Sequence, residues 1–185
     1  MNCLAQDVET ASFPSNTFDR ILCSNGMTYL QHPQAMLQKF HLWLRPGGKL
    51  AFNNPLVPMI PLTDIICSLA QDEFGLKVTD AAAVYGTPED IVAVCGAAGF
   101  KDVQVTSTAE DREYAATTPE QFAENTFSMM AAFPANPLEK LLLPEDLQQL
   151  KSAYMPEATT MAAAMETQKG SILLQYTMLW AVAAI

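Results

Sequence analysis

The chain has 185 residues, of which 50% are hydrophobic and 16% are charged, and its formal net charge is -10. Such a composition can bury a core, which excludes a disordered tail. The 10 basic residues are too few for the large basic surface that nucleic acids or anionic membranes require.

The first elements predicted along the chain are a strand, a helix and a second strand. Residues 18–24 (FDRILCS) are a short apolar run that predicts a buried strand. A helix is expected from Pro33 to Pro46, with apolar residues at helical spacing. The glycine pair that follows turns the chain into a strand over 49–54. This order is typical of a parallel sheet and predicts the α/β fold class.

Three further helix starts are predicted at threonine residues. Thr63 is expected to cap a helix that ends near Gly75. Thr87 and Thr118 are each followed by a proline and then by an acid or amide at the third helical position. This pattern is the capping-box signal, and the helix that begins after Thr87 is expected to end at Gly99.

The remaining elements complete the alternation of strands and helices. A strand is predicted around 103–105, a loop over 133–137 and a last long strand over 171–183. Pro144 begins a helical region that Pro156 is expected to break or kink.

Residues 7–52 carry motifs that resemble those of a known family. They contain Asp7-Val8-Glu9, then FPSNTFDRILCSNGMTYLQHP, then LRPGGKLAF. In order and spacing these resemble class I S-adenosylmethionine-dependent methyltransferases, most closely the small-molecule branch that includes quinone-biosynthesis enzymes. The resemblance implies the C-terminal part of a Rossmann-like, seven-stranded sheet, mostly parallel with an antiparallel last strand and helices on both faces. It also implies a single, N-terminally incomplete domain over 1–185, with a helical insertion or lid over 108–170.

The resemblance further implies that the cofactor is S-adenosylmethionine. Asp7 and the N–H of Val8 resemble the family's adenine-reading pair, and the alternative is that Asp7 is a solvated loop acid. Ligands of open α/β sheets lie beyond the carboxyl ends of the strands. Residues that leave the first strand at that end would line the methionine part of the cofactor: Ser24, Asn25, Gly26 and Met27.

Thr28 and Tyr29 hold positions at which relatives face the methyl acceptor. The alternative for Met27 and Tyr29 is plain packing under the following helix. Methionine and aromatic residues between Phe122 and Met165 either line an apolar acceptor pocket or belong to the core. The implied activity is methyl transfer to a small, apolar acceptor.

No catalytic triad or metal site is predicted. The 4 cysteines are scattered, and neither of the 2 histidines has a serine or cysteine partner in a recognisable pattern. No catalytic residue is therefore assigned. Scattered, reduced thiols are typical of a cytoplasmic protein, and the longest apolar run, 172–185, is too short for stable membrane insertion.

The family's glycine-rich loop and ribose-binding acid would precede Met1. Residues 18–24 are then expected to form an exposed apolar strand edge through which the chain self-associates. A second interpretation is a non-catalytic remnant or interaction module that retains the second half of the fold. A nucleotide-binding oxidoreductase shares the α/β alternation, but the chain has no GxGxxG motif.

Overall fold

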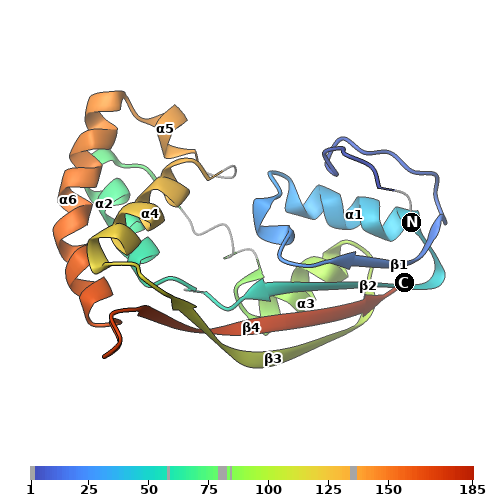
Figure 1. Cartoon of the computed structure of the whole chain (residues 1–185). Helices are drawn as coiled ribbons and strands as arrows, with labels where there is room; N and C mark the ends of the chain where they lie inside the picture. The colour runs from blue at the N-terminus through green and yellow to red at the C-terminus, as the bar shows by residue number, and fades with distance from the viewer. Residues whose placement is uncertain (1–2, 58, 79–82, 84, 134–136) are drawn as a thin grey trace.

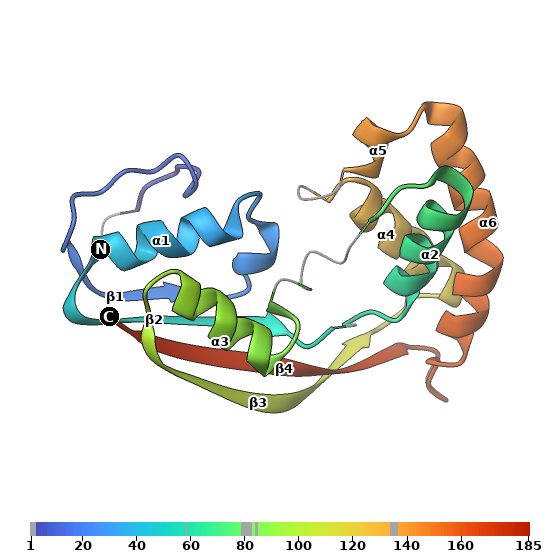
Figure 2. The same ribbon diagram turned by 180° about the vertical axis from the view of Figure 1, so that it is seen from behind.

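The computed structural model describes residues 3–57, 59–78, 83, 85–133 and 137–185. Two groups of helices lie toward opposite ends of a long, twisted sheet (Figures 1 and 2). The elements in chain order are β1 (Phe18–Cys23), the 3-10 turn η1 (Met27–Tyr29), α1 (Pro33–Trp43), β2 (Leu44–Pro55), α2 (Leu62–Phe74), α3 (Pro88–Ala97), β3 (Lys101–Tyr114), α4 (Pro119–Ala131), α5 (Leu138–Leu141), α6 (Pro144–Ala163) and β4 (Ile172–Ala184).

The sheet has the strand order β1-β2-β4-β3. β1 and β2 are parallel, whereas β4 lies between β2 and β3 and is antiparallel to both. This arrangement confirms the predicted α/β class, the parallel strand–helix–strand unit and the antiparallel last strand. Within the described chain β1 is an edge strand, as predicted, and its Leu22 is 79% exposed.

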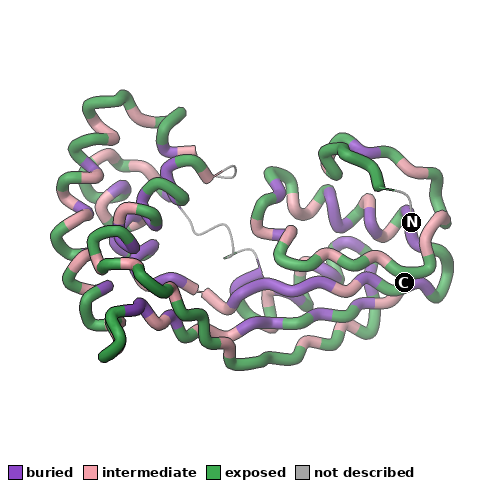
Figure 3. The backbone as a smooth tube through the Cα atoms, in the orientation of Figure 1, coloured by how far each residue is buried: buried purple, intermediate pink, exposed green. Residues whose placement is uncertain are grey.

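Side-chain alternation along β4 separates two hydrophobic cores. Leu179, Ala181 and Ala183 point to one face, where they pack with residues of α1 and α3. Ile172 and Leu174 point to the opposite face, where they pack with residues of α2, α4 and α6. Helices therefore cover both faces of the sheet, one group toward each end, and Figure 3 shows buried segments in both regions.

Local capping begins two helices where the sequence predicts them. The Thr87 hydroxyl accepts the N–H of Asp90 at 3.1 Å. Thr118 and Gln121 form a reciprocal capping box, with N···O distances of 3.0 and 3.2 Å. No helix in the described part of the chain is long and apolar enough to cross a membrane.

The boundary between α1 and β2 differs from the prediction. α1 ends at Trp43 rather than at Pro46, and β2 already begins at Leu44, which pairs with Phe18 of β1. Gly47 lies within β2 with a φ of 77°. This pairing with β1 extends the second strand toward its N-terminus, where the sequence indicates only a turn.

The prediction that Thr63 caps a helix is wrong, and of the break or kink expected at Pro156 the break does not occur. Thr63 does not cap α2, because the helix already begins at Leu62 and Pro61 is its N-cap residue. Pro156 does not break α6, which continues from Pro144 to Ala163. Pro156 is on the exposed side of the helix, and packing holds the other side in place through four buried residues: Leu150, Tyr154, Ala158 and Ala162.

Helices α4, α5 and α6 follow β3 and precede β4. Their role as an insertion or lid over 108–170 stays a prediction. Of the predicted loop over 133–137, residues 134–136 lie outside the described residues.

Candidate functional site

The turn after β1 is the centre of the candidate site. Residues 24–29 connect the carboxyl end of β1 to α1 through η1. Asn25 has a left-handed backbone with a φ of 53°. Its N–H donates to Oδ1 of Asn53 on β2 at 2.7 Å, and Asn53 is only 5% exposed. Asparagine adopts this conformation more readily than most residues, and the hydrogen bond fixes the turn against the sheet.

Gly26 allows the turn to fold back closely over β1. A Cβ atom at this position would lie 2.8 Å from Sγ of Cys23, which is closer than real Cβ contacts. Burial raises the pKa of the Cys23 thiol, and the hydrogen bond from the backbone N–H of Gly26 opposes this only in part. The thiol is therefore protonated at neutral pH and is not an activated nucleophile.

One side of the turn faces a groove of about 520 Å³ that runs along β1. Val8, Ser24 and Gly26, three of the residues assigned to the cofactor, line this groove. The rest of its lining comes from the N-terminal segment, β1, α1 and the residue after η1: Phe13, Phe18, Arg20, Ile21, Leu22, Cys23, Leu30, Phe40 and Trp43.

Asp7 and Met27 are placed differently from the other assigned residues. Asp7 is exposed beside Val8, and its Oδ1 accepts the N–H of Glu9 at 2.9 Å. Met27 is 1% exposed and belongs to the core beneath the turn. Its side chain lines neither the groove nor the cavity described next.

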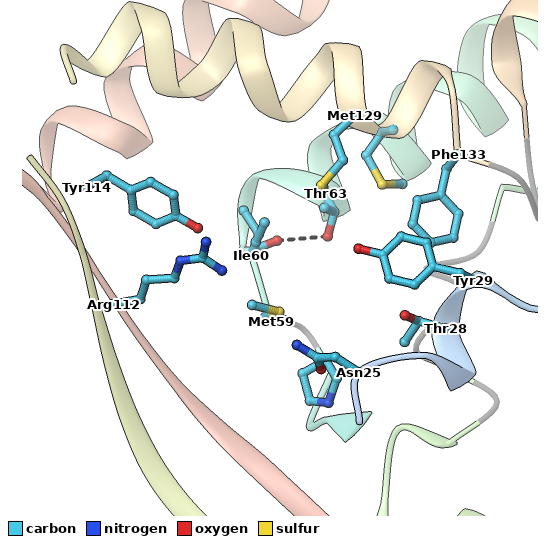
Figure 4. A pocket seen from close by; sticks show the side chains of 12 residues that line it. Asn25, Thr28, Tyr29, Met59, Ile60, Thr63, Arg112, Tyr114, Met129 and Phe133 are labelled. Carbon is cyan, nitrogen blue, oxygen red and sulfur yellow. Dashed lines mark hydrogen bonds between the residues drawn. The ribbon is translucent and has the colours of Figure 1, made fainter. Parts of the chain in front are cut away.

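The other side of the turn faces a cavity of about 160 Å³ (Figure 4). Asn25 lines it, together with Thr28 and Tyr29, the two residues assigned to the acceptor. The Tyr29 ring stacks on Phe133 with a centroid distance of 5.5 Å and an interplanar angle of 26°. The remaining lining residues come from β2, the segment that enters α2, α2 itself, β3 and α4: Pro55, Met59, Ile60, Thr63, Arg112, Tyr114, Met129 and Met130.

Comparison with known proteins shows what the N-terminal part of the chain is similar to. Residues 1–52 match the protein family described as a methyltransferase domain. Over these residues the chain is similar to the class I S-adenosylmethionine-dependent methyltransferases. The match contains the Asp7-Val8 segment and the 24–29 turn.

Relatives with similar sequence are methyltransferases of plants. The chain is 35% identical over 48 residues to phosphoethanolamine N-methyltransferase of Triticum aestivum, which covers 26% of this chain. It is 29% identical over 107 residues to phosphoethanolamine N-methyltransferase 3 of Arabidopsis thaliana, which covers 57% of this chain. The chain spans only 10% and 19%, respectively, of the lengths of these two relatives.

A solved structure shares the fold at low sequence identity. The YcgJ protein of Bacillus subtilis superimposes with a TM-score of 0.53 and 13% identity. The superposition covers 97% of this chain and 68% of that chain.

The methyltransferase motifs found in the sequence do not include Arg112 and Tyr114. Both side chains extend from β3 toward the cavity (Figure 4), and the Arg112 guanidinium carbon lies 5.1 Å from the Tyr114 ring centroid. Arg112 forms no ion pair with a carboxylate of the described residues. Alternation along a strand extending to Tyr114 would place both residues on one face, but the sequence predicts a strand only around 103–105.

Proposed function

We propose that this chain takes part in methyl transfer from S-adenosylmethionine to a small acceptor. The observation that carries the proposal is that the 24–29 turn separates two concave sites. Ser24 and Gly26 line the groove, whereas Thr28 and Tyr29 line the cavity. A cofactor in the groove and an acceptor in the cavity would meet at the turn.

The chemistry of methyl transfer agrees with the side chains present. The acceptor displaces the thioether directly from the methyl carbon, so the protein's main contribution is alignment of the two reactants. The reaction requires no nucleophilic side chain. The protonated thiol of Cys23 is therefore compatible with the proposed activity.

The cavity supports an acceptor with an apolar part and an anionic group. Met59, Met129 and the stacked Tyr29 and Phe133 rings provide apolar contact surface. Arg112 is the only cation among the described lining residues, and a guanidinium binds a carboxylate or phosphate through paired hydrogen bonds. The plant relatives are named for phosphoethanolamine, a small amine that carries a phosphate.

Two glycine variants test whether the turn binds the cofactor. Gly26→Val adds a side chain where Sγ of Cys23 lies 2.8 Å from the first added atom, whereas a Cβ at Gly96 in α3 meets nothing within 4 Å. In calorimetric titration with S-adenosylhomocysteine, Gly26→Val is expected to lower the affinity at least about tenfold, and Gly96→Val to leave it unchanged. Equal affinities for the two variants would refute the assignment of the 24–29 turn to cofactor binding.

The acceptor class has its own test. Methyl transfer is measured with phosphoethanolamine and with ethanolamine, which lacks the phosphate. Arg112→Gln is expected to raise KM for phosphoethanolamine about tenfold, the equivalent of one charge-assisted hydrogen bond. An unchanged KM for phosphoethanolamine would show that Arg112 does not bind the acceptor.

An uncovered apolar strip supports a second candidate function, that of an interaction module. Leu22, Trp180 and Val182 are 79%, 43% and 40% exposed. Leu22 pairs with Ala51, which pairs with Val182, so these side chains share one face of the sheet. A folded chain that self-associates and binds no S-adenosylhomocysteine would favour this function.

A further inference from the structure

Glu9 joins the N-terminal segment to the beginning of α1. Its Oε2 accepts the N–H of Gln31 at 2.9 Å, and its Oε1 accepts the N–H of His32 at 2.8 Å. The backbone carbonyl of Glu9 also accepts a hydrogen bond from Nζ of Lys39 in α1. These contacts tie one residue of the segment to three positions that are 22 to 30 residues away.

α1 has no acidic or capping side chain of its own at this end. His32 is its N-cap residue and makes no side-chain capping hydrogen bond, and its first turn contains no acid. A carboxylate that binds N–H groups at a helix N-terminus satisfies unpaired donors and interacts favourably with the helix dipole. Glu9 supplies this carboxylate from a distant part of the sequence.

The backbone N–H of the same residue also orients Asp7. The N–H of Glu9 donates to Oδ1 of Asp7 at 2.9 Å, and the carbonyl of Asp7 accepts the N–H groups of Thr10 and Ala11 at 3.2 and 3.0 Å. Among the described residues, none donates a hydrogen bond to Oδ2 of Asp7. One carboxylate oxygen is therefore held in place, and the other makes no hydrogen bond to the described residues.

We infer that Glu9 is a positioning residue for the cofactor, an inference that rests on the proposed function. Glu9 anchors the Asp7–Val8 segment to α1, the helix into which the 24–29 turn leads. The two segments assigned to the adenine and methionine parts of the cofactor are thereby held at a fixed separation. Prior ordering of a binding segment raises affinity because less freedom is lost on binding.

A double-mutant cycle between Glu9 and Asp7 tests this role. Calorimetric titration with S-adenosylhomocysteine is done on the full chain, on Glu9→Ala, on Asp7→Ala and on the double variant. Glu9→Ala and Asp7→Ala are each expected to weaken binding about tenfold. Because the Glu9 carboxylate holds the segment that carries Asp7, the loss of affinity in the double variant is expected to be smaller than the sum of the two single losses.

Control variants separate positioning from general stability. Glu89→Ala removes an exposed acid from the first turn of α3 and is expected to leave the affinity unchanged. Glu9→Gln keeps an oxygen acceptor and is expected to restore part of the affinity. Additive effects in the cycle, or unchanged affinity of Glu9→Ala, would overturn the positioning role of Glu9 but would leave the proposed function standing. Absence of binding by the folded, unsubstituted chain would instead refute the proposed function, and the role of Glu9 with it.

Discussion

Replacement of Asn53 by alanine is expected to loosen the turn on which the candidate site depends. The Asn53 side chain is 5% exposed, and its Oδ1 accepts the N–H of Asn25 at 2.7 Å. Asn25 holds a left-handed φ of 53°, a conformation that surrounding contacts must maintain. Without Asn53, a part-buried N–H loses its acceptor and the turn loses its connection to β2.

The magnitude follows from the loss of this one contact. A buried donor left without a partner costs about 1–3 kcal/mol, and we expect about 2 kcal/mol less free energy of unfolding. For a chain of this size such a change lowers Tm by about 4–8 °C. The affinity for S-adenosylhomocysteine is expected to fall about tenfold, because the displaced turn no longer presents Ser24 and Gly26 to the groove.

A matched control is available on α4. Asn125 is exposed, so Asn125→Ala makes the same chemical change without removing a buried contact. Thermal unfolding and calorimetric titration are measured for both variants. If Asn53→Ala had the same Tm and the same affinity as Asn125→Ala, the conclusion that Asn53 holds the turn would be refuted.

Three further predictions concern stability and association. Leu22→Lys places a charge on the exposed edge strand and is expected to reduce the self-association that we propose for this edge. Light scattering at increasing protein concentration measures this. Equal self-association of the variant and the unsubstituted chain would show that the edge is not the contact. Burial raises the pKa of the Cys95 thiol from 9.0 to about 11, so its stabilising effect is complete below pH 9.0 and is lost as the pH rises to about 11. Urea unfolding is measured at a pH below this interval and at one above it. The free energy of unfolding should decrease less between the two for Cys95→Ala than for the unsubstituted chain. Equal decreases would contradict a stabilising effect of the protonated Cys95 thiol. Pro156→Ala restores a helical N–H on the exposed side of α6 and should raise the free energy of unfolding by about 1–2 kcal/mol, whereas a loss of stability would show that the proline is required.

Features fixed by nearby residues were predictable from the sequence. Thr87 and Thr118 begin their helices as expected, because the bonds that define these caps join residues three positions apart. The parallel unit of β1, α1 and β2 was also predictable, since its apolar runs and turn residues are contiguous. The motifs that indicated a methyltransferase lie within this unit and just before it.

Features fixed by distant contacts were not predictable. Asn53 lies 28 residues from Asn25, and nothing local indicates that its amide oxygen holds a turn. Arg112 reaches the cavity only because β3 continues to Tyr114 in pairing with β4. Pro156 suggested a break in α6, but burial of the opposite helix side outweighs the hydrogen bond that proline cannot make.

Binding of S-adenosylhomocysteine to the chain tests the proposed function most directly. Calorimetric titration is expected to show saturable binding at one site. Asp7→Ala should weaken it about tenfold, whereas Asp72→Ala, which removes an exposed acid from α2, should not. A chain that unfolds cooperatively on heating, and is therefore folded, but shows no heat of binding would contradict the proposed cofactor site.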